Sequence, residues 1–183
     1  MEAVVRTDTS WLRFVDPSRI VQATDAASVG YTIAAVEQLT RGGAKWAVGF
    51  VSYEAGAAYG LRVHAPHDVP LAWFAIFDRP PDRFDDLAQW SPEHTAPSPV
   101  FGPMRPTVTR DAFARAFNRI KELIVAGDTY QVNYTFRLEG RLSADSRELF
   151  ASLARSQRGR YSAFIRTGDL VICSASPELF FRR

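Results

Sequence analysis

The sequence predicts an α+β protein, because segments with helical spacing of apolar residues alternate with segments that have the spacing of β-strands. Three observations carry this prediction. Some segments repeat apolar residues every three or four positions, two runs are apolar throughout, and one segment alternates strictly between apolar and polar residues. Of the 183 residues, 46% are hydrophobic and 23% are charged, so the chain can bury a core and is not a disordered protein.

The first part of the chain contains the pattern of one helix and two strands. Asp25 is placed to cap a helix, and Gly42 and Gly43 are placed to end it. The apolar face of this helix consists of Val29, Ile33, Val36 and Leu39. Residues 46–51 and 71–77 are apolar without alternation, which indicates strands that are covered on both faces.

Prolines mark the boundary between two regions. Seven of the 11 prolines lie within the 27 residues from Pro80 to Pro106, and this density removes backbone donors and fixes φ. Residues 79–105 are therefore expected to form an irregular connection. We place an N-terminal domain at residues 1–105, including this connection, and the first part of a second domain at residues 106–183.

The second region contains two helical patterns and one hairpin pattern. Thr109 or Asp111 can begin a helix that Gly127 caps at its C-terminal end. Another helix is expected after Asp145, with Leu149, Phe150 and Leu153 on its inner face. Residues 161–167 and 170–176 predict two strands that a two-residue loop joins into a hairpin.

Residues 130–139 give the clearest strand pattern in the sequence, and the polar face of this strand has two interpretations. That face carries Gln131, Asn133, Thr135 and Arg137. An antiparallel strand can simply expose such a face to water. Alternatively, amide and hydroxyl groups on one rigid strand form a surface for an anionic small molecule, with Arg137 pairing with a carboxylate. The pattern alone leaves both interpretations open.

Charge, cysteine content and hydropathy disfavour several classes of protein. The net charge is only +2 and the basic residues are spread along the chain, so we expect no nucleic-acid interface. The single Cys173 cannot form an internal disulfide, which predicts a reducing, cytoplasmic setting. No apolar run approaches the about 20 residues that span a bilayer, and the N-terminus lacks the apolar core of a secretory signal.

No motif for metal binding or covalent catalysis stands out. His64 and His67 are three residues apart, but Pro66 between them indicates a loop, and no cysteine or carboxylate cluster completes a site. The sequence also lacks a glycine-rich phosphate loop and a nucleophile elbow. We therefore assign no catalytic residue and no metal ligand.

Three segments carry distinctive motifs, namely residues 124–135 with the run Tyr-Gln-Val-Asn, residues 49–55, and residues 174–180 with Ser-Pro-Glu. Together they resemble the chorismate-utilising family formed by component I of aminodeoxychorismate synthase and of anthranilate synthase. The segments occur in the order of the family, and the resemblance covers about residues 11–183. Tyr-Gln-Val-Asn and Ser-Pro-Glu favour the aminodeoxychorismate branch over the anthranilate branch.

The resemblance implies antiparallel β-sheets that pack face to face with flanking helices, and a fold that is incomplete at the C-terminus. It implies that Gln131, Asn133 and Thr135 line or support the side of the chorismate-binding domain that faces the substrate. It also implies that an amino-acid pocket of the kind found in relatives is faced by Pro177, Leu179 and Phe180.

The resemblance further implies the reaction of the complete enzyme. Chorismate and ammonia would form 4-amino-4-deoxychorismate for para-aminobenzoate and folate synthesis, with Mg²⁺ as cofactor. The partners would be a glutamine amidotransferase, called component II, and a fused or separate class IV aminotransferase-like lyase.

The family's Pro-Ile-Lys-Gly-Thr segment and its acidic magnesium ligands are not found in this sequence. The resemblance thus implies that this chain is the N-terminal portion of a longer enzyme and lacks the catalytic lysine and the Mg²⁺ ligands. We therefore expect this chain alone to be inactive. Two alternatives stay open, namely a fragment of anthranilate synthase component I and a non-catalytic interaction or regulatory module.

Overall fold

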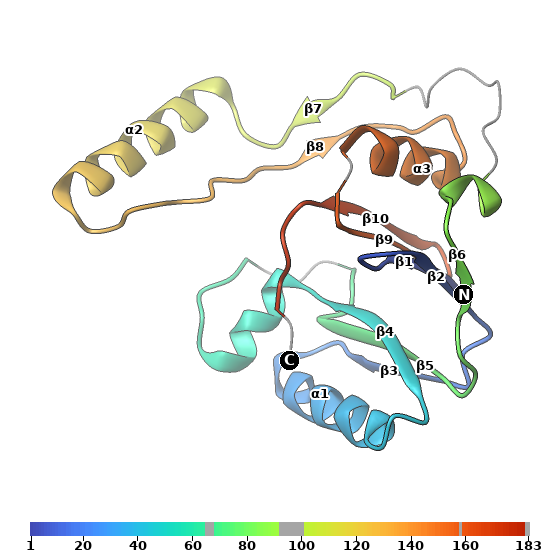
Figure 1. Cartoon of the computed structure of the whole chain (residues 1–183). Helices are drawn as coiled ribbons and strands as arrows, with labels where there is room; N and C mark the ends of the chain where they lie inside the picture. The colour runs from blue at the N-terminus through green and yellow to red at the C-terminus, as the bar shows by residue number, and fades with distance from the viewer. Residues whose placement is uncertain (65–67, 92–100, 158, 182–183) are drawn as a thin grey trace. The chain divides into compact units, whose positions relative to one another are not determined.

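The computed structural model describes residues 1–64, 68–91, 101–157 and 159–181 (Figure 1). The chain divides into two compact units: unit 1 comprises residues 1–95 and 146–183, and unit 2 comprises residues 96–145. This division differs from the boundary expected after residue 105. Residues 146–183 belong with the N-terminal part of the chain, because the strands that they form pair with the first strand.

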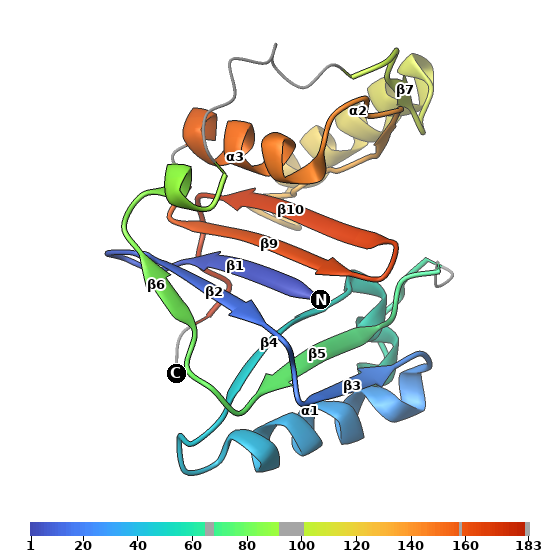
Figure 2. The same ribbon diagram turned by 90° about the vertical axis from the view of Figure 1, so that its right-hand side faces the viewer.

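Unit 1 is built on two antiparallel sheets (Figure 2). The larger sheet has five strands in the order β10-β9-β1-β2-β6. These strands are β1 (Glu2–Arg6), β2 (Trp11–Val15), β6 (Asp82–Phe84), β9 (Tyr161–Thr167) and β10 (Leu170–Ser176). The smaller sheet has the order β3-β5-β4. Its strands are β3 (Arg19–Ala23), β4 (Trp46–Val51) and β5 (Ala72–Phe77).

The first strand lies in the middle of the larger sheet. β1 pairs with β2 on one edge, and on the other edge it pairs with β9, so that Glu2 lies opposite Arg166. The sequence analysis predicted neither β1, β2 nor β3. These strands are five residues long, and charged and polar residues interrupt their apolar pattern. The hairpin of β9 and β10 was predicted, and it is confirmed.

The two sheets pack face to face, as predicted. One apolar cluster takes side chains from both sheets. The larger sheet contributes Ala3, Phe14 and Ile165, and β5 of the smaller sheet contributes Trp73, Ala75 and Phe77. The other face of β5 is also covered, because Ala72 and Phe74 lie in a second apolar cluster on the opposite side of the smaller sheet. Cover on both faces explains the lack of alternation in this strand.

Helices cover the two outer faces of this sandwich. The smaller sheet carries α1 (Ala26–Thr40) and the 3₁₀-helix η1 (Tyr53–Tyr59), where Val29 and Ala55 are buried together with Leu71 and Ala72. The larger sheet carries α3 (Ser146–Gln157). Asp25 caps α1 as predicted, since its carboxylate accepts a hydrogen bond from the Ser28 N–H. Unit 1 therefore has the layers helix, sheet, sheet and helix (Figure 2).

The proline-rich connection is less irregular than expected. Directly after Pro80 and Pro81, strand β6 pairs with β2. The 3₁₀-helix η2 (Leu87–Gln89) follows and buries Leu87 in the cluster beneath α3. Apolar residues between the prolines thus contribute to the core of unit 1. Residues 92–100 of the connection lie outside the described residues.

The described residues of unit 2, 101–145, form one helix and one short strand pair. α2 (Arg110–Ala126) begins after Thr109, whose hydroxyl accepts a hydrogen bond from the Ala112 N–H, and ends at Gly127 with φ at 80°. β7 (Arg105–Pro106) pairs with β8 (Leu138–Glu139). The helix was predicted, and both of its caps are confirmed.

The strand predicted over residues 130–139 is wrong for most of its length, because only Leu138 and Glu139 are paired. A strand requires a neighbour that accepts and donates its backbone hydrogen bonds. Within the described part of unit 2, β7 is the only neighbouring strand, and it is two residues long. Alternation showed which residues share a face, but it carried no information about a partner strand.

Gly49 allows β4 to lie close to β5. It stands opposite Phe74, and a Cβ built on Gly49 would lie 2.8 Å from the Phe74 Cα and closer still to the Trp73 carbonyl oxygen. We expect Gly49→Ala to lower the free energy of unfolding by about 1–3 kcal/mol, because backbone must move to make room. Urea denaturation followed by circular dichroism measures this change.

The matched control is Gly30→Ala in α1. A Cβ at Gly30 would meet nothing within 4 Å, so the same substitution is expected to stabilise the protein by about 0.5–1 kcal/mol. Equal effects of the two substitutions would show that the close approach at Gly49 does not constrain the sheet.

Candidate functional site

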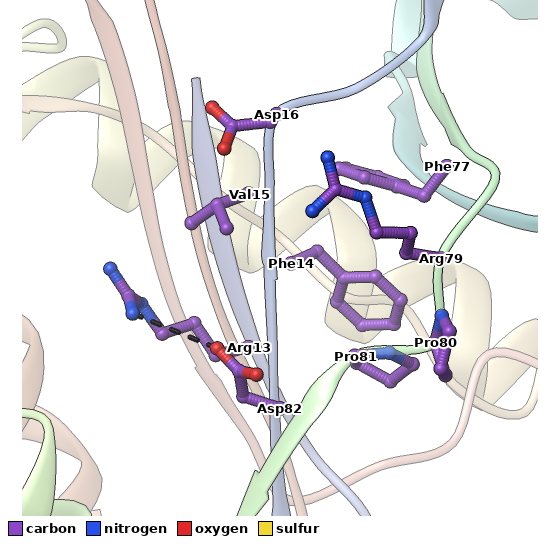
Figure 3. A pocket seen from close by; sticks show the side chains of 9 residues that line it. All are labelled: Arg13, Phe14, Val15, Asp16, Phe77, Arg79, Pro80, Pro81 and Asp82. Carbon is purple, nitrogen blue, oxygen red and sulfur yellow. Dashed lines mark ion pairs between the residues drawn. The ribbon is translucent and has the colours of Figure 1, made fainter.

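A small pocket in unit 1 lies where the chain passes from one sheet to the other (Figure 3). The end of β2 and the segment from β5 to β6 form it, with a volume of about 100 Å³. Its lining residues are Arg13, Phe14, Val15, Asp16, Phe77, Arg79, Pro80, Pro81 and Asp82. Pockets that enclose a complete drug-sized ligand measure roughly 300–1,000 Å³. This pocket can therefore hold only a small group.

The pocket combines an aromatic wall with charges of both signs. The rings of Phe14 and Phe77 lie 5.1 Å apart between centroids. Figure 3 shows Asp16 and Arg79 on one side of Phe14, and the ion pair between Arg13 and Asp82 on the other. Asp16 has φ at 54°, a conformation that few residues other than glycine adopt, and it directs the chain out of β2. Such a site offers partners to both an anionic and a cationic group.

The position of Arg13 is fixed by a buried carboxylate. Glu2 is 6% exposed, and its carboxylate accepts hydrogen bonds from Arg13 Nε at 2.8 Å, Trp90 Nε1 at 2.9 Å and Arg147 Nη2 at 2.6 Å. Burial raises the pKa of the Glu2 carboxyl, but the hydrogen bonds from Trp90, Arg13 and Arg147 outweigh it and hold the pKa below its ordinary value of 4.5. Glu2 is thus a charged group in the folded protein at neutral pH.

The residues predicted for the substrate side lie in unit 2. Gln131, Asn133 and Thr135 are exposed on an extended segment that follows α2. The Gln131 amide nitrogen donates a hydrogen bond to the Asn133 Oδ1 at 3.3 Å, so these two side chains share a face. None of the three lines the pocket of unit 1. Their role in substrate binding stays a prediction.

The residues predicted for an amino-acid pocket follow β10 in unit 1. Pro177, Leu179 and Phe180 are exposed, with Phe180 at 91%, and none of them lines the described pocket. The chain turns here instead of continuing as a strand, because the Ser176 hydroxyl accepts a hydrogen bond from the Glu178 N–H and donates one to the Glu178 carbonyl oxygen. The amino-acid pocket therefore stays a prediction.

Sequence analysis overlooked the charged residues of the pocket. Asp16 precedes Pro17, and Arg79 precedes Pro80, so each charge stands between the end of an apolar strand and a proline. A proline fixes φ and favours an extended or turn conformation before it, which places the preceding side chain at a sheet edge. This pattern could have indicated the site, but the two positions are far apart in the sequence.

The described residues provide no obvious metal centre. Among them, no three His, Cys, Asp or Glu side chains lie close enough to hold a metal ion. His64 is exposed, and His67 lies outside the described residues. The Mg²⁺ that the resemblance implies therefore stays a prediction for the complete enzyme, and no step is assigned to that ion. No described helix has the length and apolar character that crossing a membrane requires.

Comparisons with known proteins agree on one family. Residues 5–183 match the family described as chorismate binding enzyme. Aminodeoxychorismate synthase component 1 of Escherichia coli K12 is 36% identical over 73 residues, which cover 40% of this chain and 16% of that protein. The protein of the same name from Bacillus subtilis 168 is 35% identical over 71 residues, which cover 39% of this chain and 15% of that protein.

A plant protein of the other branch is also similar. Anthranilate synthase alpha subunit 2, chloroplastic, of Arabidopsis thaliana is 32% identical over 85 residues, which cover 45% of this chain and 14% of that protein. The matched segments thus span at most 16% of the length of these three relatives.

Removing the charge of Glu2 tests its structural role. We expect Glu2→Gln to lower the free energy of unfolding by about 1–3 kcal/mol at neutral pH, because two arginines and the Trp90 indole then face a neutral amide. The matched control is Asp82→Asn. Asp82 is the more distant partner of Arg13, with 3.8 Å between Oδ2 and Nη1, and its side chain is 69% exposed. This change is expected to cost less than about 1 kcal/mol.

The pH dependence of stability gives a second measurement for Glu2. Because the folded pKa lies below the unfolded value, the stabilisation is complete above the unfolded pKa and is lost as the pH falls through the folded pKa. Urea denaturation from neutral to acid pH should therefore show the wild-type protein and Glu2→Gln converging at low pH. A constant difference between them would contradict the assignment.

Proposed function

The chain belongs to the chorismate-binding enzyme family, and on this premise we propose that it forms part of component I of an aminodeoxychorismate synthase. The complete enzyme would convert chorismate and ammonia to 4-amino-4-deoxychorismate for para-aminobenzoate and folate synthesis. The observation that carries the proposal is the family match over residues 5–183. The similarity to aminodeoxychorismate synthase component 1 of two bacteria supports the choice of branch.

The proposal includes partners and conditions for the complete enzyme. A glutamine amidotransferase would supply ammonia, a fused or separate lyase would act on the product, and Mg²⁺ would be the cofactor of the complete enzyme. The single, half-buried Cys173 is compatible with a cytoplasmic setting.

In unit 2, the proposed substrate residues are chemically suited to a polar dianion. The amides of Gln131 and Asn133 and the hydroxyl of Thr135 are neutral donors that can bind carboxylate or hydroxyl oxygens. All three side chains are accessible. The hydrogen bond between Gln131 and Asn133 places these two side-chain amides next to each other.

The two lysines of the chain are poor candidates for a nucleophile. Lys45 forms an ion pair with Asp78, at 2.8 Å between Nζ and Oδ1. Lys121 lies on α2 with its ammonium group 5.8 Å from the centroid of the Phe117 ring. Neither lines the described pocket. We therefore propose that this chain alone does not convert chorismate.

Two rival functions have different support. The similarity to the Arabidopsis protein favours anthranilate synthase component I, which would release anthranilate. A non-catalytic interaction or regulatory module would bind a partner without turnover, and the exposed apolar residues of unit 2 favour that rival.

The experiment is a product assay with chorismate, ammonium salt and Mg²⁺, followed by mass spectrometry. The 183-residue protein is expected to give no product, whereas the longest reading frame that contains it is expected to give 4-amino-4-deoxychorismate. The Escherichia coli component 1 serves as the positive control. Anthranilate as the product would support the first rival, and no product from either protein would support the second. Turnover by the 183-residue protein would contradict its proposed inactivity.

A further inference from the structure

The pocket of unit 1 opens where two strands of the larger sheet separate. β6 pairs with β2 as far as Arg13, which lies opposite Asp82. The chain before β6 comes from β5 of the smaller sheet and passes through Pro80 and Pro81 (Figure 2). β2 continues to Val15, for which none of the described strands provides a partner on this edge. The pocket lies in the resulting gap.

The backbone of Val15 faces this gap. The Thr7 N–H donates to the Ser10 carbonyl oxygen at 2.8 Å, so the backbone groups of Ser10 point toward the strand that Thr7 follows, β1. Because these groups point to alternate edges along an antiparallel strand, those of Val15 point away from β1 and into the gap. Pro80 stands next in the ladder, but a proline has no N–H to donate to the Val15 carbonyl. A ligand can use both groups of Val15.

Two opposite charges at the pocket are not paired with each other. Figure 3 shows Asp16 and Arg79 on the same side of the Phe14 ring, and no ion pair joins them. Neither side chain forms an ion pair or a hydrogen bond with another of the described residues. The other two charges of the pocket differ, because Arg13 and Asp82 pair with each other at 3.8 Å. One positive and one negative group can therefore bind a ligand.

The floor between these charges is apolar and small. The buried rings of Phe14 and Phe77 form it, and the rings of Pro80 and Pro81 line the pocket beside them (Figure 3). The volume is about 100 Å³, whereas an engineered apolar cavity that holds benzene measures about 150 Å³. An aromatic side chain is thus too large for this floor, and a short aliphatic group fits.

The conformation of Asp16 supports a binding role. Its φ of 54° is uncommon for a residue with a side chain. Such positions cost free energy and concentrate at sites that bind ligands. In this pocket the turn places a carboxylate directly after the backbone groups of Val15.

We propose that this pocket binds a small zwitterion, namely a free α-amino acid whose side chain contains three or four aliphatic carbons. Arg79 and the Val15 N–H would donate to its carboxylate, and the charge on both partners strengthens the guanidinium contact. The Asp16 carboxylate and the Val15 carbonyl oxygen would accept from its ammonium group. Its side chain would lie against the rings of Phe14 and Phe77, where it is removed from water.

Ligands of other charge use this pocket less well. Asp16 repels an anion, and Arg79 repels a cation. A neutral apolar molecule would displace water from both charges and from the Val15 backbone without replacing the lost hydrogen bonds. A zwitterion is the class of small ligand that satisfies all of these groups.

This pocket is separate from the amino-acid pocket that the resemblance implies. The residues predicted for that pocket follow Ser176, the end of β10, which lies opposite Tyr161 of β9. β2 ends at Val15, which lies opposite Glu2, and Glu2 lies opposite Arg166 near the other end of β9. The two sites are thus at opposite ends of the larger sheet.

The first measurement is a titration of the isotope-labelled 183-residue protein with L-valine, followed by amide chemical shifts in NMR spectra. We expect saturable shifts at the amides of Val15, Asp16 and Arg79, because these residues line the pocket. No shift at these amides up to the solubility limit of valine would overturn the proposal.

Two analogues of valine test the need for both charges. Isovalerate keeps the carboxylate and the aliphatic group but lacks the ammonium group, and isobutylamine lacks the carboxylate. Each is expected to bind about tenfold more weakly than valine, since each loses one charged hydrogen-bonding group. Equal affinity of either analogue and valine would contradict recognition of a zwitterion.

Matched charge changes test the two side chains. Arg79→Gln and Asp16→Asn are each expected to raise the dissociation constant for valine about tenfold. Asparagine tolerates positive φ, so the turn is kept. The controls are Arg83→Gln and Asp85→Asn, which make the same changes at exposed positions outside the pocket and should leave the constant unchanged. Equal effects inside and outside the pocket would overturn the assignment.

Discussion

The buried carboxylate of Glu2 is the interaction on which the architecture of unit 1 depends. It binds Arg13 of β2, Arg147 of α3 and Trp90 after η2, so one side chain of β1 connects three segments that are distant in the sequence. A carboxylate in this position is costly to bury unless every oxygen has a donor. The same contact holds Arg13 at the edge of the pocket, and it therefore links the core of the unit to its candidate site.

Much of the fold could be predicted where local physics decides the structure. α1 has its predicted N-cap, α2 has both of its predicted caps, and the predicted β9–β10 hairpin forms. β1 could not be predicted, because its stability comes from β9, which lies far along the chain. For residues 130–137 a strand was predicted but does not form. Their alternation described correctly which residues share a face, but a strand exists only with a partner strand.

The candidate site was harder to predict than the fold. The resemblance directed attention to Gln131 and Asn133, whose hydrogen bond confirms that they share a face but not what they bind. The pocket between the sheets depends on Asp16 and Arg79, which the fold brings to one cavity from two separate connections. Such a site is a property of tertiary structure. The family match shows a chorismate-binding enzyme family, while the chemistry of the complete enzyme rests on proposals.

The central position of β1 also affects how the protein is made. β1 leaves the ribosome long before its neighbour β9 (Tyr161–Thr167). During synthesis, one edge of β1 must therefore wait until β9 has been made, with Ala3 and Val4 open to solvent or to other chains. Binding of this edge by a chaperone would protect the chain over that interval. The position of β1 thus makes completion of the larger sheet depend on the later synthesis of β9 and β10.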